Sequence, residues 1–192
     1  MLHYGFNNPN KSYDLSENNQ DTEITFAENE KDLGVTFDTD LKFRQHINNC
    51  INKANSVVGI IKRSFLSLKK KPFIKLYKST VRSILEYGNI IWSPRFNQDI
   101  QALERVQRRA TKIVYNIKDL SYQERLKRLD LPSLVYRRLR GDLIECYKLF
   151  HNQNDIDSKI FFKIAHNNTR GHPFKVQKQQ CRLDVRKNFF SK

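Results

Sequence analysis

Hydrophobic positions recur at helical spacing through the middle of the chain. From residue 41 the apolar residues follow one another at alternating steps of four and three, which predicts a long amphipathic helix. That stripe consists of Ile47, Ile51, Ala54, Val58, Ile61, Phe65 and Leu68. A second helix is predicted from Pro72 to about Trp92, because proline suits a first helical turn and Ser93-Pro94 disfavours continuation. Its apolar face is expected to hold Phe73, Leu76/Tyr77, Thr80/Val81, Ile84, Gly88 and Ile91.

Three further helices follow. One starts near Asn97, with the apolar stripe Ile100, Leu103, Val106/Gln107, Ala110, Ile113/Val114 and Ile117. Ser121 and Glu124 have the spacing of a capping box, which predicts a short helix to Leu129. After Pro132 a fifth helix is expected, with Val135, Leu139, Leu143, Cys146 and Phe150 on one face.

Residues 1–40 carry only short apolar stretches among many Asn, Asp and Glu residues. We expect Leu2–Tyr4, Ile24–Phe26 and Leu33–Phe37 to form short strands. The predicted fold is therefore mainly α, with about five helices in a bundle and a small N-terminal β region. Four parts are expected: a β region at 1–40, a helical bundle at 41–118, a helical extension at 119–165, and a basic irregular tail at 166–192.

The charge of the chain changes sign at the same boundary near residue 40. Residues 1–40 hold two Lys/Arg against nine Asp/Glu, whereas the remainder holds 33 basic against 11 acidic residues, within a total of +15. That asymmetry predicts a polyanionic partner for the second part, namely RNA or DNA. Membrane phosphate is the other candidate, but no run of about 18 apolar residues could span a bilayer, so no membrane partner is expected. A simply solvated basic surface is the remaining alternative.

Catalytic and metal-binding patterns are missing from the sequence. The close acidic pairs, such as Asp38/Asp40, lie in polar, turn-like stretches and include no Asp-Asp dipeptide. No Gly-rich phosphate loop or nucleophile motif occurs, and the three cysteines form no CxxC, so no metal site, no cofactor and no small-molecule substrate are predicted. His46, beside a helix start, is expected to be a capping or packing residue. Without a signal peptide, we expect an intracellular protein, nuclear or cytoplasmic and not secreted.

The strongest candidate site is a basic helical face. Arg105, Arg108, Arg109 and Lys112 follow i, i+3, i+4, i+7 spacing and share a face opposite the apolar stripe. Like charges on one face repel one another, so a polyanionic partner explains them, with a solvated helix face as the alternative. The other predicted nucleic-acid-binding residues are Lys62, Arg63, Lys69, Lys70, Lys71, Arg137 and Arg138. For Tyr87, Trp92 and Tyr115, core packing is favoured over stacking on bases.

A series of segments resembles the region after the palm in reverse transcriptases of non-LTR retrotransposons, in the Jockey-like LINE group. Two of them are Ser83-Ile84-Leu85-Glu86-Tyr87-Gly88 and Leu103-Glu104-Arg105-Val106-Gln107-Arg108-Arg109-Ala110. The others are residues 30–35, 37–38, 41–43 with 46–47, 91–94, 122–126, 131–134 with 137–138, and 182–190. The series covers nearly the whole chain and is densest over residues 30–150.

The resemblance implies a position within a longer enzyme. In that family an endonuclease is followed by fingers, palm and a helical thumb, and the enzyme copies its RNA into nicked chromosomal DNA. The catalytic Asp residues of the palm, which bind Mg²⁺, precede the segment matched here, so none is carried over and Asp38 and Asp40 are not metal ligands. Leu33, Gly34 and Val35 would correspond to the hairpin that supports the primer end, and the helices to the thumb that grips the template–primer duplex.

The predicted function is therefore a fragment of an RNA-directed DNA polymerase that lacks the catalytic carboxylates and is not an enzyme by itself. It would contact the backbone of RNA or DNA without sequence preference, and the family's upstream palm would be a further partner. The alternatives are a helical protein-interaction module and a non-functional relic of a mobile element.

Overall fold

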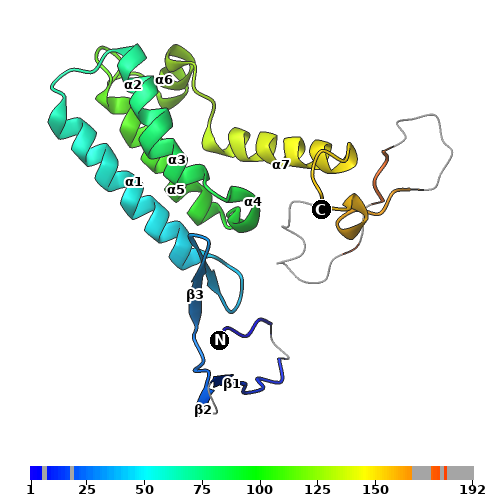
Figure 1. The fold of residues 1–192 in the computed structure, drawn as a ribbon. Coiled ribbons are helices and arrows are strands. Elements are labelled where there is room, and N and C mark those ends of the chain that lie inside the picture. The colour runs from blue at the N-terminus through cyan, green and yellow to red at the C-terminus, as the bar shows by residue number, and fades with distance from the viewer. Residues whose placement is uncertain (6–7, 18–19, 166–173, 178–179, 181–192) are drawn as a thin grey trace. The chain divides into compact units, whose positions relative to one another are not determined.

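The structure, a computed structural model, describes residues 1–5, 8–17, 20–165, 174–177 and 180 (Figure 1). It is mainly α with a short N-terminal β region, which confirms the predicted fold class. The elements are β1 (Asp14–Glu17), β2 (Gln20–Glu23), β3 (Asn29–Asp32), β4 (Val35–Asp38), α1 (Arg44–Ser64), α2 (Lys70–Leu76), the π-helix η1 (Tyr77–Val81), α3 (Arg82–Glu86), α4 (Asn89–Trp92), α5 (Asn97–Ala110), the 3-10 helix η2 (Thr111–Ile113), α6 (Tyr122–Leu129), α7 (Leu134–Phe150) and the 3-10 helix η3 (Ser158–Ile160).

The chain divides into two compact units, Met1–Asp130 and Leu131–Lys192. The boundary that we expected at residue 118 falls inside the first unit, because α6 packs against η2. Most of the predicted tail, 166–192, lies outside the described residues.

The β region consists of two antiparallel hairpins, β1–β2 and β3–β4. The strands predicted at Leu2–Tyr4 and Ile24–Phe26 are absent. The observed strands β1 and β2 have mostly polar sequences, and their antiparallel pairing, not apolar alternation, defines them. In the second hairpin Asn29 pairs with Asp38, and Leu33 and Gly34 form the turn with φ angles of 44° and 87°. Two positive φ values match the turn that suits the twist of a tight hairpin. The expected strand at Leu33–Phe37 therefore begins at Val35.

The core of the first unit lies on one side of α1. The predicted stripe is buried at Ile47, Ala54, Val58 and Ile61, where α1 packs against α5, η1 and α3. The helix ends at Ser64, however, so the stripe does not continue as helix. Phe65 is exposed, and Leu68 is buried only because the chain turns back, with its carbonyl accepting a hydrogen bond from the Tyr115 N–H at 3.0 Å.

The second predicted helix is divided into three parts. A π-turn at Tyr77–Val81 inserts an extra residue per turn, so the buried face passes from Tyr77 and Val81 to Leu85 instead of the predicted Ile84. The helix then breaks at Gly88, which has a φ of 62°, and resumes as α4. As a result Trp92 is fully buried, whereas the apolar pattern had predicted that Ile91 would face the core.

The second unit is built on α7. Ser133 caps the helix by accepting the Tyr136 N–H at 3.2 Å, as its position before the helix favours. The packing gathers at the C-terminal end, where the Phe150 ring lies 4.8 Å from Phe162 and 5.7 Å from Phe174. The face predicted to be apolar is therefore exposed over the first turns, at Val135, Leu139 and Leu143.

Candidate nucleic-acid interface

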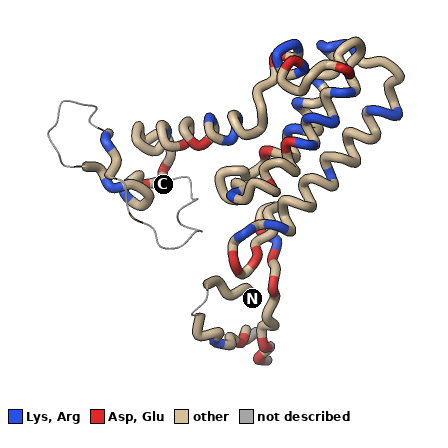
Figure 2. The backbone as a smooth tube through the Cα atoms, turned by 180° about the vertical axis from the view of Figure 1, so that it is seen from behind, with Lys and Arg blue, Asp and Glu red and all other residues tan. Residues whose placement is uncertain are grey.

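Helix α5 separates its apolar and basic residues. Its buried side includes Leu103, Val106 and Ala110. Of the predicted basic residues, Arg105, Arg108 and Arg109 are exposed on the other side of α5, and Lys112 is exposed in η2, directly after it. Figure 2 shows that the lysines and arginines of the first unit lie mostly on the helices, whereas acidic positions are frequent on the N-terminal hairpins. The amphipathic separation expected from the spacing is therefore present in the fold.

The basic face of α5 continues onto α1 through Arg109, whose guanidinium donates to the Asn55 side chain at 3.5 Å. A shallow groove of about 550 Å³ runs along this contact and is lined by Asn52, Asn55, Ser56, Gly59, Ile60, Arg63 and Arg109. The side-chain amides of Asn52 and Asn55, the Ser56 hydroxyl and the open space at Gly59 suit the close approach of a nucleic-acid backbone. Arg63 and Arg109 were predicted, but sequence reasoning missed Asn52, Asn55, Ser56 and Gly59. The i, i+3, i+4 spacing of Asn52, Asn55 and Ser56 is a signal that could have found three of them.

Helix α6 contacts the basic face of α5 at Arg108. The Arg108 guanidinium lies over the Tyr122 ring, 4.8 Å from its centroid. The capping box predicted from Ser121 and Glu124 is present, with both of its backbone–side-chain hydrogen bonds formed. The carboxylate of Glu124 accepts hydrogen bonds from the Ser121 side chain and N–H, which lowers the pKa of Glu124.

A buried polar network fixes α5 between η1 and α6. The Tyr77 hydroxyl donates to Gln107 Oε1 at 2.5 Å, and the Gln107 amide donates to the Tyr122 hydroxyl at 3.0 Å. The Tyr122 hydroxyl in turn donates to the Glu104 carboxylate. Burial raises the pKa of both tyrosines, and the hydrogen bond to Glu104 adds to this effect for Tyr122. Both hydroxyls therefore stay protonated and act as donors. Their hydrogen bonds fix the orientation of α5 about its own axis.

The other predicted cations are distributed unevenly. Lys62 lies on α1, and with Arg109 and Lys112 it lines a second hollow beyond the groove. Three more are exposed where α2 begins, namely Lys69, Lys70 and Lys71. Arg137 and Arg138 belong to the second unit.

Arg138 does not fit the prediction that it contacts nucleic acid from the surface. Its side chain is only 6% exposed, whereas a phosphate contact requires an accessible guanidinium. Its charge acts on Asp142 in the next turn of α7. Burial raises the pKa of the Asp142 carboxyl, and the positive charge of Arg138 opposes that rise.

The three aromatic residues considered for base stacking differ in their exposure to solvent. Trp92 is fully buried, as predicted, but Tyr115 is 62% exposed and Tyr87 is 59% exposed. Core packing was therefore the wrong interpretation for Tyr115, which lies in a turn after η2. Tyr87 instead supports the β3–β4 hairpin, because its hydroxyl donates to the Leu33 carbonyl at 2.8 Å.

The hairpin predicted to support a primer end is fastened to the helices at its turn. Val35 is buried, and a side chain at Gly88 would meet it at 3.3 Å. The Tyr87 ring would be equally close to a side chain at Gly34. Leu33 itself is 84% exposed at the tip of the turn. Two glycines therefore allow the hairpin to pack directly against the break between α3 and α4.

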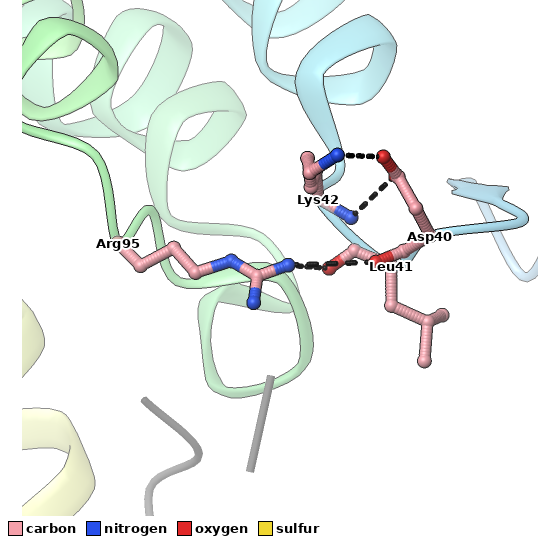
Figure 3. A network of polar contacts seen from close by, with 4 residues as sticks. All are labelled: Asp40, Leu41, Lys42 and Arg95. Atoms are coloured by element: carbon pink, nitrogen blue, oxygen red, sulfur yellow. Dashed lines mark hydrogen bonds and ion pairs between the residues drawn. The ribbon is translucent and has the colours of Figure 1, made fainter. Parts of the chain in front are cut away.

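The turn that joins this hairpin to α1 is also fixed by polar contacts (Figure 3). The Asp40 carboxylate accepts hydrogen bonds from the Lys42 N–H at 3.2 Å and from the Lys42 ammonium. Burial raises the pKa of Asp40, but the hydrogen bonds and charge of Lys42, with the charge of Arg95, outweigh that effect and lower it. Arg95 donates to the Leu41 carbonyl at 2.9 Å. Asp40 therefore has a structural role in this turn.

His46 packs behind the hairpin, as its position beside a helix start predicted. Its ring meets Trp92 edge-on at 5.0 Å, and its Nδ1 accepts the Thr36 N–H at 3.2 Å. The proton is therefore on Nε2, which lies 3.4 Å from the Cys50 sulfur. Burial, with the positive charge of Lys53, lowers the pKa of His46. Burial raises the pKa of the Cys50 thiol, so that it stays protonated at neutral pH.

We expect acid to destabilise the first unit through His46. In the unfolded chain the imidazole titrates near its ordinary pKa of about 6.5. Because the folded pKa is lower, the unfolded state binds more protons below that pH, and stability falls as the pH falls through this window. The measurement is the urea midpoint at pH 7.5 and pH 5.5 for the wild type and His46→Gln. An equal loss in both proteins would show that His46 does not contribute.

An uncharacterized protein of Caenorhabditis elegans is 27% identical over 118 residues, which is 60% of this chain and 58% of that protein. The match therefore spans little more than half of the relative. No family model matches the chain, and no solved structure gives a significant match.

Proposed function

We propose that the helical bundle is a thumb-like module that grips an RNA or DNA duplex by its phosphate backbone, derived from the reverse transcriptase of a non-LTR retrotransposon. The observation that carries the proposal is the exposed basic face of α5, which continues at Arg109 into the polar groove of α1. Arginine suits this role because its planar guanidinium can contact two phosphate oxygens at once. On this proposal the chain binds nucleic acid in the nucleus or cytoplasm, without catalysis of its own.

The length of α1 agrees with that role. The β3–β4 hairpin contacts α1 at His46, and Lys62 lies near the other end of the helix. At a rise of about 1.5 Å per residue, these positions are about 24 Å apart along the axis. A duplex lying along α1 would span about seven base pairs over that distance. The hairpin would then meet one end of the duplex while the cations hold its backbone.

In the described part of the chain, no helix combines the length and the apolar character that a bilayer crossing requires.

The proposal predicts a steep dependence of binding on salt. For the wild type bound to a blunt DNA duplex, contacts from Arg105, Arg108, Arg109 and Lys112 would give a log–log slope of about −3.6. Changing Arg108, Arg109 and Lys112 to Ala should weaken binding and make the slope shallower by about 2.7, since each lost phosphate contact removes about 0.9. Fluorescence anisotropy between 50 and 200 mM salt measures both quantities.

A matched control removes the same charge elsewhere. Lys31, Lys75 and Lys78 are exposed on β3, α2 and η1, outside the groove and the basic face. Their triple change to Gln should leave the slope close to that of the wild type. Equal slopes for the wild type and the Ala variant, or equal losses in both variants, would refute a localised interface.

A helical protein-interaction module is the second candidate, and the exposed apolar residues of α7 favour it. Contiguous exposed apolar surface often marks a contact site for another protein. The salt titration separates the two candidates, because a protein-interaction module would bind the duplex weakly and without the loss in the α5 variant.

A further inference from the structure

A hollow lies between the end of α1 and the segment that follows α5. Its volume is about 600 Å³, which is within the range of cavities that hold drug-sized ligands. Four cations line it against a single carboxylate, that of Asp119; the cations are Lys62, Arg109, Lys112 and Lys118. This balance of charge favours an anionic ligand.

The same hollow has exposed aromatic and aliphatic walls. Tyr115 is 62% exposed, Phe65 is 43% exposed and Leu66 is fully exposed. Phe65 and Leu66 come directly after α1, in a loop whose end is fixed by the hydrogen bond between the Leu68 carbonyl and the Tyr115 N–H. A parallel bridge between Leu68 and Val114 holds the two walls side by side. The apolar side chains therefore stay presented to solvent next to the cations.

Cations beside an exposed aromatic ring match the chemistry of an unpaired nucleotide. The phosphates of a single strand bind to lysine and arginine, and its bases stack on aromatic side chains, whatever their sequence. Paired bases inside a duplex are already stacked on both neighbours and offer no free face to Tyr115. Tyr115 can therefore stack on a base only where the strand is unpaired.

We propose that this hollow binds the single-stranded segment next to the duplex, with a base stacked on Tyr115 and its phosphates at Lys62 and Lys118. This inference rests on the proposed function, because the duplex held by α5 and α1 delivers the unpaired strand to the hollow. Arg109 lines both the groove and the hollow and so connects the two sites. The ligand is therefore a junction between double-stranded and single-stranded nucleic acid.

The experiment compares three labelled DNA probes on the full chain: a blunt duplex, the same duplex with a short thymidine overhang, and that duplex with an abasic overhang of equal length. Fluorescence anisotropy at fixed salt should show that the thymidine overhang binds about tenfold more tightly than the abasic one, since one stacked base contributes that much. Tyr115→Ala should abolish this difference, whereas Tyr115→Phe should keep it. The blunt duplex should bind equally to all three proteins.

The outcomes distinguish this proposal from the proposed function. Equal affinity for the thymidine and abasic overhangs, or an unchanged difference in Tyr115→Ala, overturns the stacking site while duplex binding stands. A protein that binds none of the probes overturns the proposed function itself. Arg105→Gln serves as the reverse control, because it should weaken binding of the blunt and the overhang probes alike.

Discussion

Replacing Trp92 with Ala should lower the free energy of unfolding by about 3–5 kcal/mol, the usual cost of deleting a buried Trp or Phe side chain. Trp92 is fully buried at the end of α4, and its indole N–H donates to the Tyr87 carbonyl at 2.6 Å. The His46 ring packs against it, and Gly88 approaches its indole. The substitution therefore removes the side chain on which α1, α4 and the hairpin meet. Domains of this size are stable by about 5–15 kcal/mol, so the loss is a large part of the total.

Urea denaturation followed by far-UV circular dichroism is the appropriate measurement, because Trp92 is the single tryptophan of the chain and its fluorescence is lost in the variant. Trp92→Phe is the matched control, since it keeps an aromatic ring in the core but lacks the indole N–H. It should cost less, about 1–3 kcal/mol for the unpaired carbonyl and imperfect packing. If Trp92→Ala unfolds at the same urea concentration as the wild type, the packing centre assigned to Trp92 does not exist.

The position of Trp92 shows where the apolar pattern stops being sufficient. Periodicity located the helical region from Pro72 to Trp92 but placed Ile91 on its face. The π-turn at Tyr77–Val81 and the break at Gly88 rotate the later residues, and both depend on tertiary packing. Periodicity assumes a regular helix, so it could not anticipate either.

The interface shows the same division between local and long-range information. The exposed basic face of α5 and the capping box at Ser121 are local features, and the sequence predicted both. The groove depends on α1 lying beside α5, so the helical spacing of Asn52 and Asn55 could indicate a shared face but not the groove that they form with Arg109. Arg138 has the same charge as its exposed neighbours, and only the fold distinguishes it as buried.

Arg125 is the second residue at which one change should have a large effect, because it is a buried cation that joins α6 to the end of α5. It is 3% exposed, and its Nε donates to the Thr111 hydroxyl at 3.0 Å. Its two terminal nitrogens donate to the carbonyls of Leu120 and Arg108. The carbonyl of Arg108 belongs to the last turn of α5, where the negative end of the helix dipole favours a cation.

We expect Arg125→Met to lower stability by about 2–4 kcal/mol, because it fills similar space but leaves buried acceptors without their donor, at about 1–3 kcal/mol each. Hydrogen exchange by mass spectrometry should show that Arg125→Met, compared with the wild type, speeds amide exchange in α6 more than in α1. The exposed Arg128, on the same helix, provides the control, and Arg128→Met should change stability by less than about 0.5 kcal/mol. Since Tyr122 of α6 lies under Arg108 on the basic face, loosening α6 should also weaken duplex binding at temperatures where α1 and α5 remain folded. Unchanged protection of α6 in Arg125→Met would mean that its capping box and apolar contacts hold it in place without the buried guanidinium.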